Sequence, residues 1–152
     1  MPKLGALIPS PLLVGIQPEE RDAMFACLAA REISFAKGSY ILREGDAVEA
    51  IGFVKIGLVH VVREDFWGNR NLITEIGTGE VFAESYACLP GSELSVSVVA
   101  VENTTVIFLD VRRVLTTCNS ACEYHQVLIR NLVSMLAAKN LTLNEKLQHI
   151  TQ

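Results

Sequence analysis

The chain has 152 residues, half of them hydrophobic and a fifth charged, with a net charge of −4. This length suits one globular domain with an appended element, and the composition excludes a disordered chain. The apolar runs are too short to span a membrane and no signal peptide is evident, so we expect a cytoplasmic protein without membrane contact. No block of Lys or Arg is present to neutralise DNA phosphates, so we expect no direct DNA binding by these residues.

The cysteine pattern gives no indication of a metal site or a disulfide framework. The four cysteines, Cys27, Cys88, Cys118 and Cys122, show no Cys-x-x-Cys spacing. In a cytosolic chain such residues are typically reduced thiols in the core.

The first predicted element is a short helix that begins at Gln17-Pro18-Glu19-Glu20. Proline fits the first helical turn, and the two acids lie near the positive end of the helix dipole. Met24, Phe25 and Leu28 follow at helical spacing, so we expect an amphipathic helix that ends near Arg31.

From Glu32 to Leu109 the hydrophobic pattern has a period of two, and glycine-containing turns recur at short intervals. The alternating pairs and runs are Ile33/Phe35, Tyr40/Leu42, Leu58/His60/Val62, Val59/Val61, Leu94/Val96/Val98 and Val106/Phe108. Seven or eight short strands at this spacing predict a sandwich or a barrel-like roll. The fold class is therefore mainly β with helices.

The pattern after Asp110 is helical again. Residues 110–115 predict a short helix, and Ser120-x-x-Glu123 is a candidate capping box that opens a run without Pro or Gly up to Gln152. An unbroken helix from 120 to 151 would be about 48 Å long, more than a small roll can cover. We expect it to pair with its own copy, although a helix that breaks near Asn140 and folds back is an alternative.

The apolar stripe on this helix defines the expected homodimer interface. Its predicted members are Leu128, Leu132, Met135, Leu136, Lys139, Leu143 and Leu147. The expected organisation is a helix plus roll over 1–118 and a long dimerisation helix over 119–152.

Between the two helical regions, residues 76–97 carry a recognisable motif: a Gly-rich turn, Ala83-Glu84, and then Leu94-Ser95 about ten residues later. The segment resembles the phosphate-binding cassette of the catabolite-activator and fumarate-nitrate-regulator family of bacterial transcription regulators. In that cassette a Gly-Glu pair opens a short helix, and an Arg-Ser or Arg-Thr pair completes the phosphate cradle. Here Ala83 stands at the Gly position and Leu94 at the Arg position, while Glu84 and Ser95 are kept.

Stretches 35–46, 51–61 and 68–80 are also similar to the family's strand pattern, so that the resemblance covers residues 12–150. It implies an eight-stranded antiparallel, jelly-roll-like β-roll with a short N-terminal helix and a long C-terminal dimerisation helix. In the family a DNA-binding winged helix-turn-helix domain follows that helix, and it is absent from these residues. The resemblance thus implies the sensing and dimerising half of a ligand-responsive regulator, which contacts DNA only through that further domain.

The resemblance assigns Glu84 to ribose hydroxyls and Ser95 to the phosphate. Leu94 offers neither charge nor donor, and each charge-assisted hydrogen bond contributes about 1.5–3 kcal/mol. The best-known member also uses Thr-Ser before a Glu-Lys pair on the long helix, where this chain has Leu143 and Asn144 before Glu145. We therefore predict that cyclic AMP is not the physiological ligand.

Three hypotheses for the effector remain open: a small, largely apolar or anionic-aromatic molecule in the same cavity, a redox or haem sensor, or a scaffold without a ligand. The first places the site at Phe82, Ala83, Glu84, Ser85, Tyr86, Leu94, Ser95, Leu143 and Asn144. No cysteine cluster supports the second hypothesis, so we expect no haem or iron–sulfur cofactor. A further alternative is that Glu84 simply caps backbone N–H groups at a helix start.

The remaining polar residues favour structural roles. We expect His60 to be a hydrogen-bonded strand histidine, His125 and His149 to be solvated or interfacial, and Trp67 to lie at an exposed hairpin tip. The three histidines form no pair that could build a facial metal triad, and no nucleophile–base spacing is present, so we predict no enzymatic activity.

Overall fold

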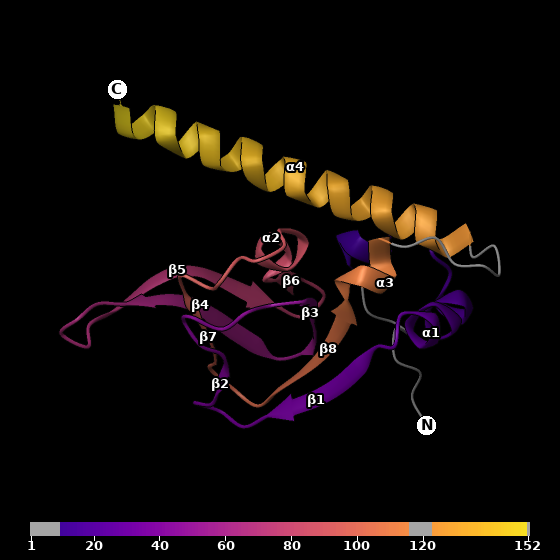
Figure 1. Ribbon diagram of the computed structural model, residues 1–152, viewed down its shortest axis with the longest axis horizontal. Coiled ribbons are helices and arrows are strands. Elements are labelled where there is room, and N and C mark those ends of the chain that lie inside the picture. The colour runs from indigo at the N-terminus through magenta and orange to yellow at the C-terminus, as the bar shows by residue number, and fades with distance from the viewer. Residues whose placement is uncertain (1–9, 116–122, 152) are drawn as a thin grey trace.

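The structure is a computed structural model that describes residues 10–115 and 123–151, with the backbone alone described over 123–125 and 149–151. Two four-stranded antiparallel sheets form a β-roll, and helices cover one side of it (Figure 1). The predicted fold class, a mainly β roll with a short N-terminal and a long C-terminal helix, is confirmed. The predicted capping residue Ser120, the thiols Cys118 and Cys122 and the boundary at 118/119 lie outside the described residues, as do the side chains of His125 and His149.

Each sheet is assembled from strands that are distant in sequence. One sheet has the order β1-β8-β3-β6 and the other β2-β7-β4-β5, with every named pair antiparallel. The strands are β1 (Arg31–Phe35), β2 (Tyr40–Leu42), β3 (Ala50–Ile56), β4 (Leu58–Glu64), β5 (Arg70–Gly77), β6 (Val81–Phe82), β7 (Ser97–Ala100) and β8 (Thr104–Asp110).

One predicted strand begins later than the alternation suggests. Leu94 and Val96 precede β7, because the backbone of Leu94 forms hydrogen bonds with the loop at residues 45–46 and not with a neighbouring strand. Its N–H donates to the carbonyl of Asp46 at 3.0 Å, and its carbonyl accepts the N–H of Gly45 at 2.8 Å. The side chain of Leu94 is therefore positioned by this loop pairing.

The helices are η1 (Pro11–Leu13), α1 (Pro18–Cys27), α2 (Glu84–Cys88), α3 (Val111–Leu115) and α4 (Glu123–Thr151). Helix α1 ends four residues before the predicted end because Ala29 adopts a left-handed conformation, with φ of 52°. Helix α4 is continuous over 29 residues, or about 43 Å, so the alternative of a break near Asn140 is wrong.

Two hydrophobic clusters hold these elements together. The first lies between the helices and the roll, where η1, α1, β3, β8 and the first half of α4 meet, and the second lies between the two sheets. Members of the first include Leu13, Phe25, Phe53, Ile107, Leu128 and Leu132; the second contains Val54, Val59, Ile76, Phe82, Val98, Val106 and Phe108.

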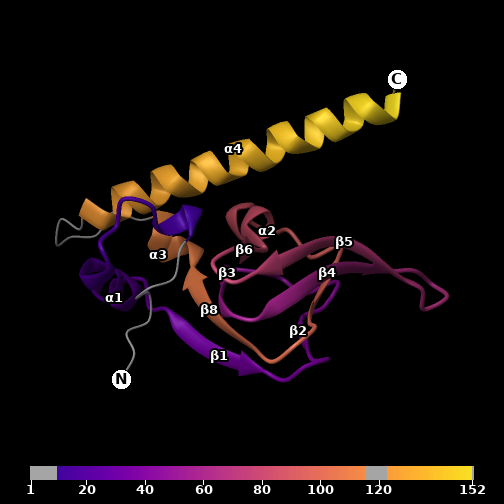
Figure 2. The same cartoon turned by 180° about the vertical axis from the view of Figure 1, so that it is seen from behind.

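The first half of α4 is fixed to the body of the domain. The side-chain amide of Asn131 donates to the carbonyls of Leu12 and Val14, both at 2.8 Å. Beyond this anchor α4 continues over α2, and its C-terminal end rises away from the roll on the side of the molecule where the β4–β5 hairpin extends (Figures 1 and 2). None of the helices in the described part of the chain has the length and apolar character needed to cross a membrane.

A glycine in β3 sets the position of β6 and hence of the segment that follows it. A Cβ at Gly52 would overlap the ring of Phe82, which packs directly on the glycine. We expect Gly52→Ala to lower the free energy of unfolding by about 1–3 kcal/mol, because the ring must move out of a packed core. Urea denaturation measures this, and the double variant with Phe82→Leu should lose less than the sum of the two single changes. Unchanged stability of Gly52→Ala would contradict this packing.

Candidate functional site

The predicted cassette is centred on the turn from β6 into α2. Ala83 precedes α2 in the left-handed conformation, with φ of 63° and ψ of 11°. Glycine adopts this conformation freely, whereas alanine pays about 1–2 kcal/mol for it. The backbone shape expected for a glycine at this position is thus kept although the glycine is not.

Glu84, the first residue of α2, is buried and paired with the long helix. Its side chain is only 6% exposed, and one carboxylate oxygen accepts a hydrogen bond from the Lys139 ammonium group on α4. The Lys139 side chain is about half exposed. An isolated buried carboxylate is costly, so Lys139 is the group that makes the burial of Glu84 tolerable.

A cavity of about 140 Å³ lies beside this ion pair. Among the described residues that line it, Glu84 and Lys139 are the charged ones, and they pair with each other. The wall is formed by Val61, Thr74, Ile76, Val81, Phe82, Ala83, Glu84, Ser85, Tyr86 and Lys139, so it joins β4, β5, β6 and α2 to α4. Of the predicted site residues, Phe82 through Tyr86 are brought together here.

The second half of the predicted cassette does not line this cavity. Leu94 is 3% exposed and packs in the first hydrophobic cluster. Ser95 is exposed, and its hydroxyl lies 2.7 Å from the phenol oxygen of Tyr86. Leu94 therefore contributes apolar packing, and Ser95 is linked to the cavity only through Tyr86.

Leu143 and Asn144 lie farther along α4 and are exposed, with no place in the cavity wall of this single chain. Their assignment to a ligand site remains a prediction.

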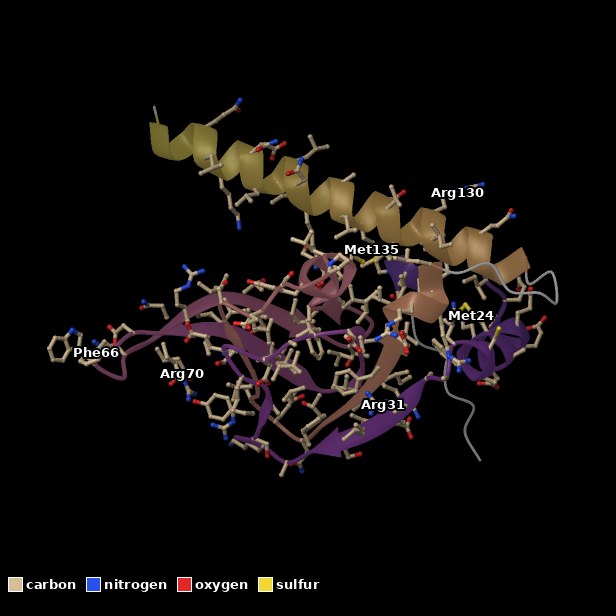
Figure 3. The ribbon with its side chains drawn as sticks, in the orientation of Figure 1. Met24, Arg31, Phe66, Arg70, Arg130 and Met135 are labelled. Atoms are coloured by element: carbon tan, nitrogen blue, oxygen red, sulfur yellow. The ribbon has the colours of Figure 1, made fainter. Side chains whose placement is uncertain are left out.

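The predicted dimer residues separate into two groups along α4. Leu128 and Leu132 are buried in the first cluster, and Met135 and Leu136 pack against it, so these residues serve the domain's own core. Figure 3 shows Met135 above the roll, on the side of α4 that faces it. Leu128 and Leu132 are thus buried within the single chain, and Lys139 pairs with Glu84 of its own chain. The assignment of these residues to a dimer interface remains a prediction. Leu143 and Leu147 are 55% and 50% exposed.

The cysteine and histidine nearest the site have ordinary structural environments. Burial raises the pKa of the Cys88 thiol, and the charge of Glu84 raises that pKa further, so the thiol stays protonated at neutral pH. His60 lies in β4 with its Nε2 atom 2.9 Å from a carboxylate oxygen of Glu75 on β5, consistent with the expected strand histidine. Within the described residues no group of three His, Cys, Asp or Glu side chains is arranged to hold a metal ion.

A larger open cavity, of about 810 Å³, lies elsewhere, between the loop before β3, the end of α2 and α3. The residues that line it do not overlap with those that line the cavity beside Glu84. No motif in the sequence predicted this cavity.

The sequence and the structure are both similar to those of known proteins. The model of the cyclic nucleotide-binding domain matches residues 32–121, more than half of the chain. The chain belongs to the cyclic nucleotide-binding domain family.

The chain is also similar to individual proteins of that family. The cyclic AMP receptor protein of Thermus thermophilus is 34% identical over 100 residues, which cover 66% of this chain and 45% of that protein. The crystal structure of the catabolite activator protein of Thermus thermophilus superposes with a TM-score of 0.77 at 27% identity, over 93% of this chain and 63% of that one. A cyclic nucleotide-binding domain from Methylobacillus flagellatus shares the fold, with a TM-score of 0.74 at 18% identity over 98% of this chain and 81% of that one. The chain thus spans about half to two thirds of the length of the Thermus relatives.

The Glu84–Lys139 pair predicts a specific pattern of stability changes. We expect Lys139→Met to lower the free energy of unfolding by about 1–3 kcal/mol, because it leaves a buried carboxylate unpaired. The double variant with Glu84→Gln should recover part of this loss, since it removes the orphaned charge. Thermal or urea unfolding gives these values.

Lys146→Met provides the matched control, because Lys146 is exposed on the same helix and should change stability by less than about 0.5 kcal/mol. Equal effects of Lys139→Met and Lys146→Met would contradict a stabilising role for the ion pair.

Proposed function

We propose that this chain is the ligand-sensing and dimerising part of a transcription regulator, and that it responds to a small molecule other than cyclic AMP. The observation that carries the proposal is the ion pair between Glu84 on α2 and Lys139 on α4, beside a cavity. A ligand that enters the cavity would touch an ion pair that joins the cassette to the long helix. The similarity to the Thermus regulators supports a role in transcription, with DNA bound by a domain beyond these residues and the protein located in the cytoplasm.

Two features argue against cyclic AMP as the ligand. The side chain at position 94 packs in the core and carries no charge, so the phosphate would have only Lys139 as a cation, and Lys139 is engaged by Glu84. The cavity, at about 140 Å³, is also well below the roughly 300–1,000 Å³ typical of ligand pockets.

The ion pair also restricts the chemistry of an effector. A ligand that separates Glu84 from Lys139 must offer a hydrogen-bond donor to the carboxylate and an acceptor or anion to the ammonium group, because an unpaired buried charge is costly. Thr74, Ser85 and Tyr86 add hydroxyl groups to a wall that is otherwise apolar. Separation of the pair would release α4 from α2, which gives the ligand two states of the helix to discriminate.

Thermal-shift measurements on the purified chain test the effector proposal. We expect no stabilisation by micromolar cyclic AMP or cyclic GMP, and stabilisation by members of a panel of small hydroxy acids, amino acids and aromatic acids. Glu84→Gln and Lys139→Met should abolish any such shift, since they remove the two polar partners. Stabilisation of the unaltered chain by micromolar cyclic nucleotide would disprove the proposal.

The other two hypotheses have their own signatures in the same samples. A panel without any hit, together with a spectrum free of haem or cluster absorbance, favours the ligand-free scaffold. Visible absorbance that persists after purification favours the redox or haem sensor, which the protonated Cys88 and the arrangement of the described residues do not support.

Dimer formation requires a separate test, by sedimentation velocity over a range of concentrations. We expect a dimer that Leu147→Glu weakens, because this leucine is half exposed in the C-terminal part of α4. Leu136 is unsuitable for this purpose, since it packs on the chain's own core. Leu89→Glu is the matched control, as Leu89 is an exposed leucine on the roll. A monomer at every concentration would refute the dimer.

A further inference from the structure

The larger cavity, between the loop before β3, the end of α2 and α3, has the size of a small-molecule site. Its volume of about 810 Å³ falls inside the roughly 300–1,000 Å³ range of ligand pockets. The cavity beside Glu84 is several times smaller, at about 140 Å³. Helices α2 and α3 both lie between the roll and α4 (Figures 1 and 2), so the wall of the larger cavity joins three segments that are distant in sequence.

Backbone hydrogen bonds fix these three segments relative to one another. Ala47 pairs with Glu93 in an isolated antiparallel bridge, and the N–H of Val111 donates to the carbonyl of Glu49 at 3.0 Å. The loop at residues 47–49 is therefore tied both to the segment after α2 and to the start of α3. A ligand would meet a preformed wall, which lowers the entropy cost of binding.

The most buried part of the wall is apolar. Val48, Ala87 and Val111 line the cavity, belong to the first hydrophobic cluster, and are 8%, 7% and 7% exposed. The Cys88 thiol also lines it, and burial together with the charge of Glu84 raises the pKa of this thiol, so it adds an uncharged surface. A complementary ligand therefore has an apolar body.

The charged groups of the wall leave one negative charge uncompensated. Among the described residues that line the cavity, the charged ones are Glu49, Glu93 and Arg112. A guanidinium nitrogen of Arg112 lies 3.2 Å from a carboxylate oxygen of Glu49, so these two groups pair with each other. Glu93 is exposed, and within the described part of the chain no cation pairs with its carboxylate.

We propose that this cavity is a binding site for a small amine, that is, a molecule with an apolar body and one ammonium group. The body packs on the buried apolar side chains of the wall, and the ammonium group donates charge-assisted hydrogen bonds to the Glu93 carboxylate. An anion of the same shape would be repelled by Glu93, while Arg112 is engaged by Glu49. This site is separate from the cavity of the proposed function, and the inference needs neither that effector nor the dimer.

An NMR titration of the isotope-labelled chain with phenethylamine tests both the place and the chemistry of the site. We expect saturable shifts of the backbone amides in residues 47–49, 87–93 and 111–115. The neutral 2-phenylethanol and the anionic phenylacetate have nearly the same size and shape. They should bind about tenfold more weakly or worse, because they cannot form a charge-assisted hydrogen bond with Glu93.

Variants of exposed residues test the two halves of the recognition. Glu93→Gln should raise the dissociation constant of phenethylamine about tenfold, and Leu115→Ser, which removes an exposed apolar side chain from the wall, should raise it severalfold. Glu102→Gln is the matched control and should leave binding unchanged, since Glu102 is an exposed acid outside this wall. Because all three substituted side chains are exposed, we expect the variants to fold, and thermal unfolding checks this.

The outcomes separate this inference from the proposed function. Shifts confined to residues 61, 74–76, 81–86 and 139 would place the amine in the cavity beside Glu84, which overturns the inference and leaves the proposed function in place. Equal binding of the three probes, or an unchanged dissociation constant in Glu93→Gln, overturns the recognition of an amine. A titration without saturable shifts overturns the site itself, whatever the thermal-shift panel shows for the other cavity.

Discussion

The hydrogen bond from Lys139 to Glu84 joins the two parts of the molecule that a sensor must couple. Burial of the Glu84 carboxylate is unfavourable by itself, and the cation that compensates it comes from a helix whose first half is fixed to the domain core. The same ion pair therefore compensates the buried carboxylate and links α2 to α4.

The cassette keeps the backbone of its family while its chemistry has changed. Ala83 has a left-handed conformation at the start of α2. Leu94, which aligns with the arginine of the family's motif, packs in the hydrophobic core. The polar groups that remain, with Tyr86 linked to Ser95 and Glu84 linked to Lys139, are satisfied within the chain. In this structure the polar side chains of the site pair with one another, and none of these pairs is open to a nucleotide.

The sequence predicted the roll and its helices because alternation and turn residues are local signals, and the structure confirms them. The end of α1 was predicted four residues too late, because alanine rarely adopts the left-handed conformation that Ala29 has here. The partner of Glu84 was missed for a different reason, since Lys139 lies 55 residues away and its place on the helix suggested a residue of the dimer interface. Periodicity likewise showed that Leu128 and Leu132 face something apolar, but it cannot distinguish the chain's own core from a partner.

The division of α4 into an anchored half and a free half has a consequence for how the helix unfolds. Residues 127–136 contribute side chains to the core of the domain and are expected to open only with it, whereas the described side chains of residues 140–148 are exposed. An isolated helical segment of that length is marginal in water. The last three turns are therefore expected to exchange their amide hydrogens quickly in the monomer and slowly in an assembly, so that local folding and association become a single equilibrium.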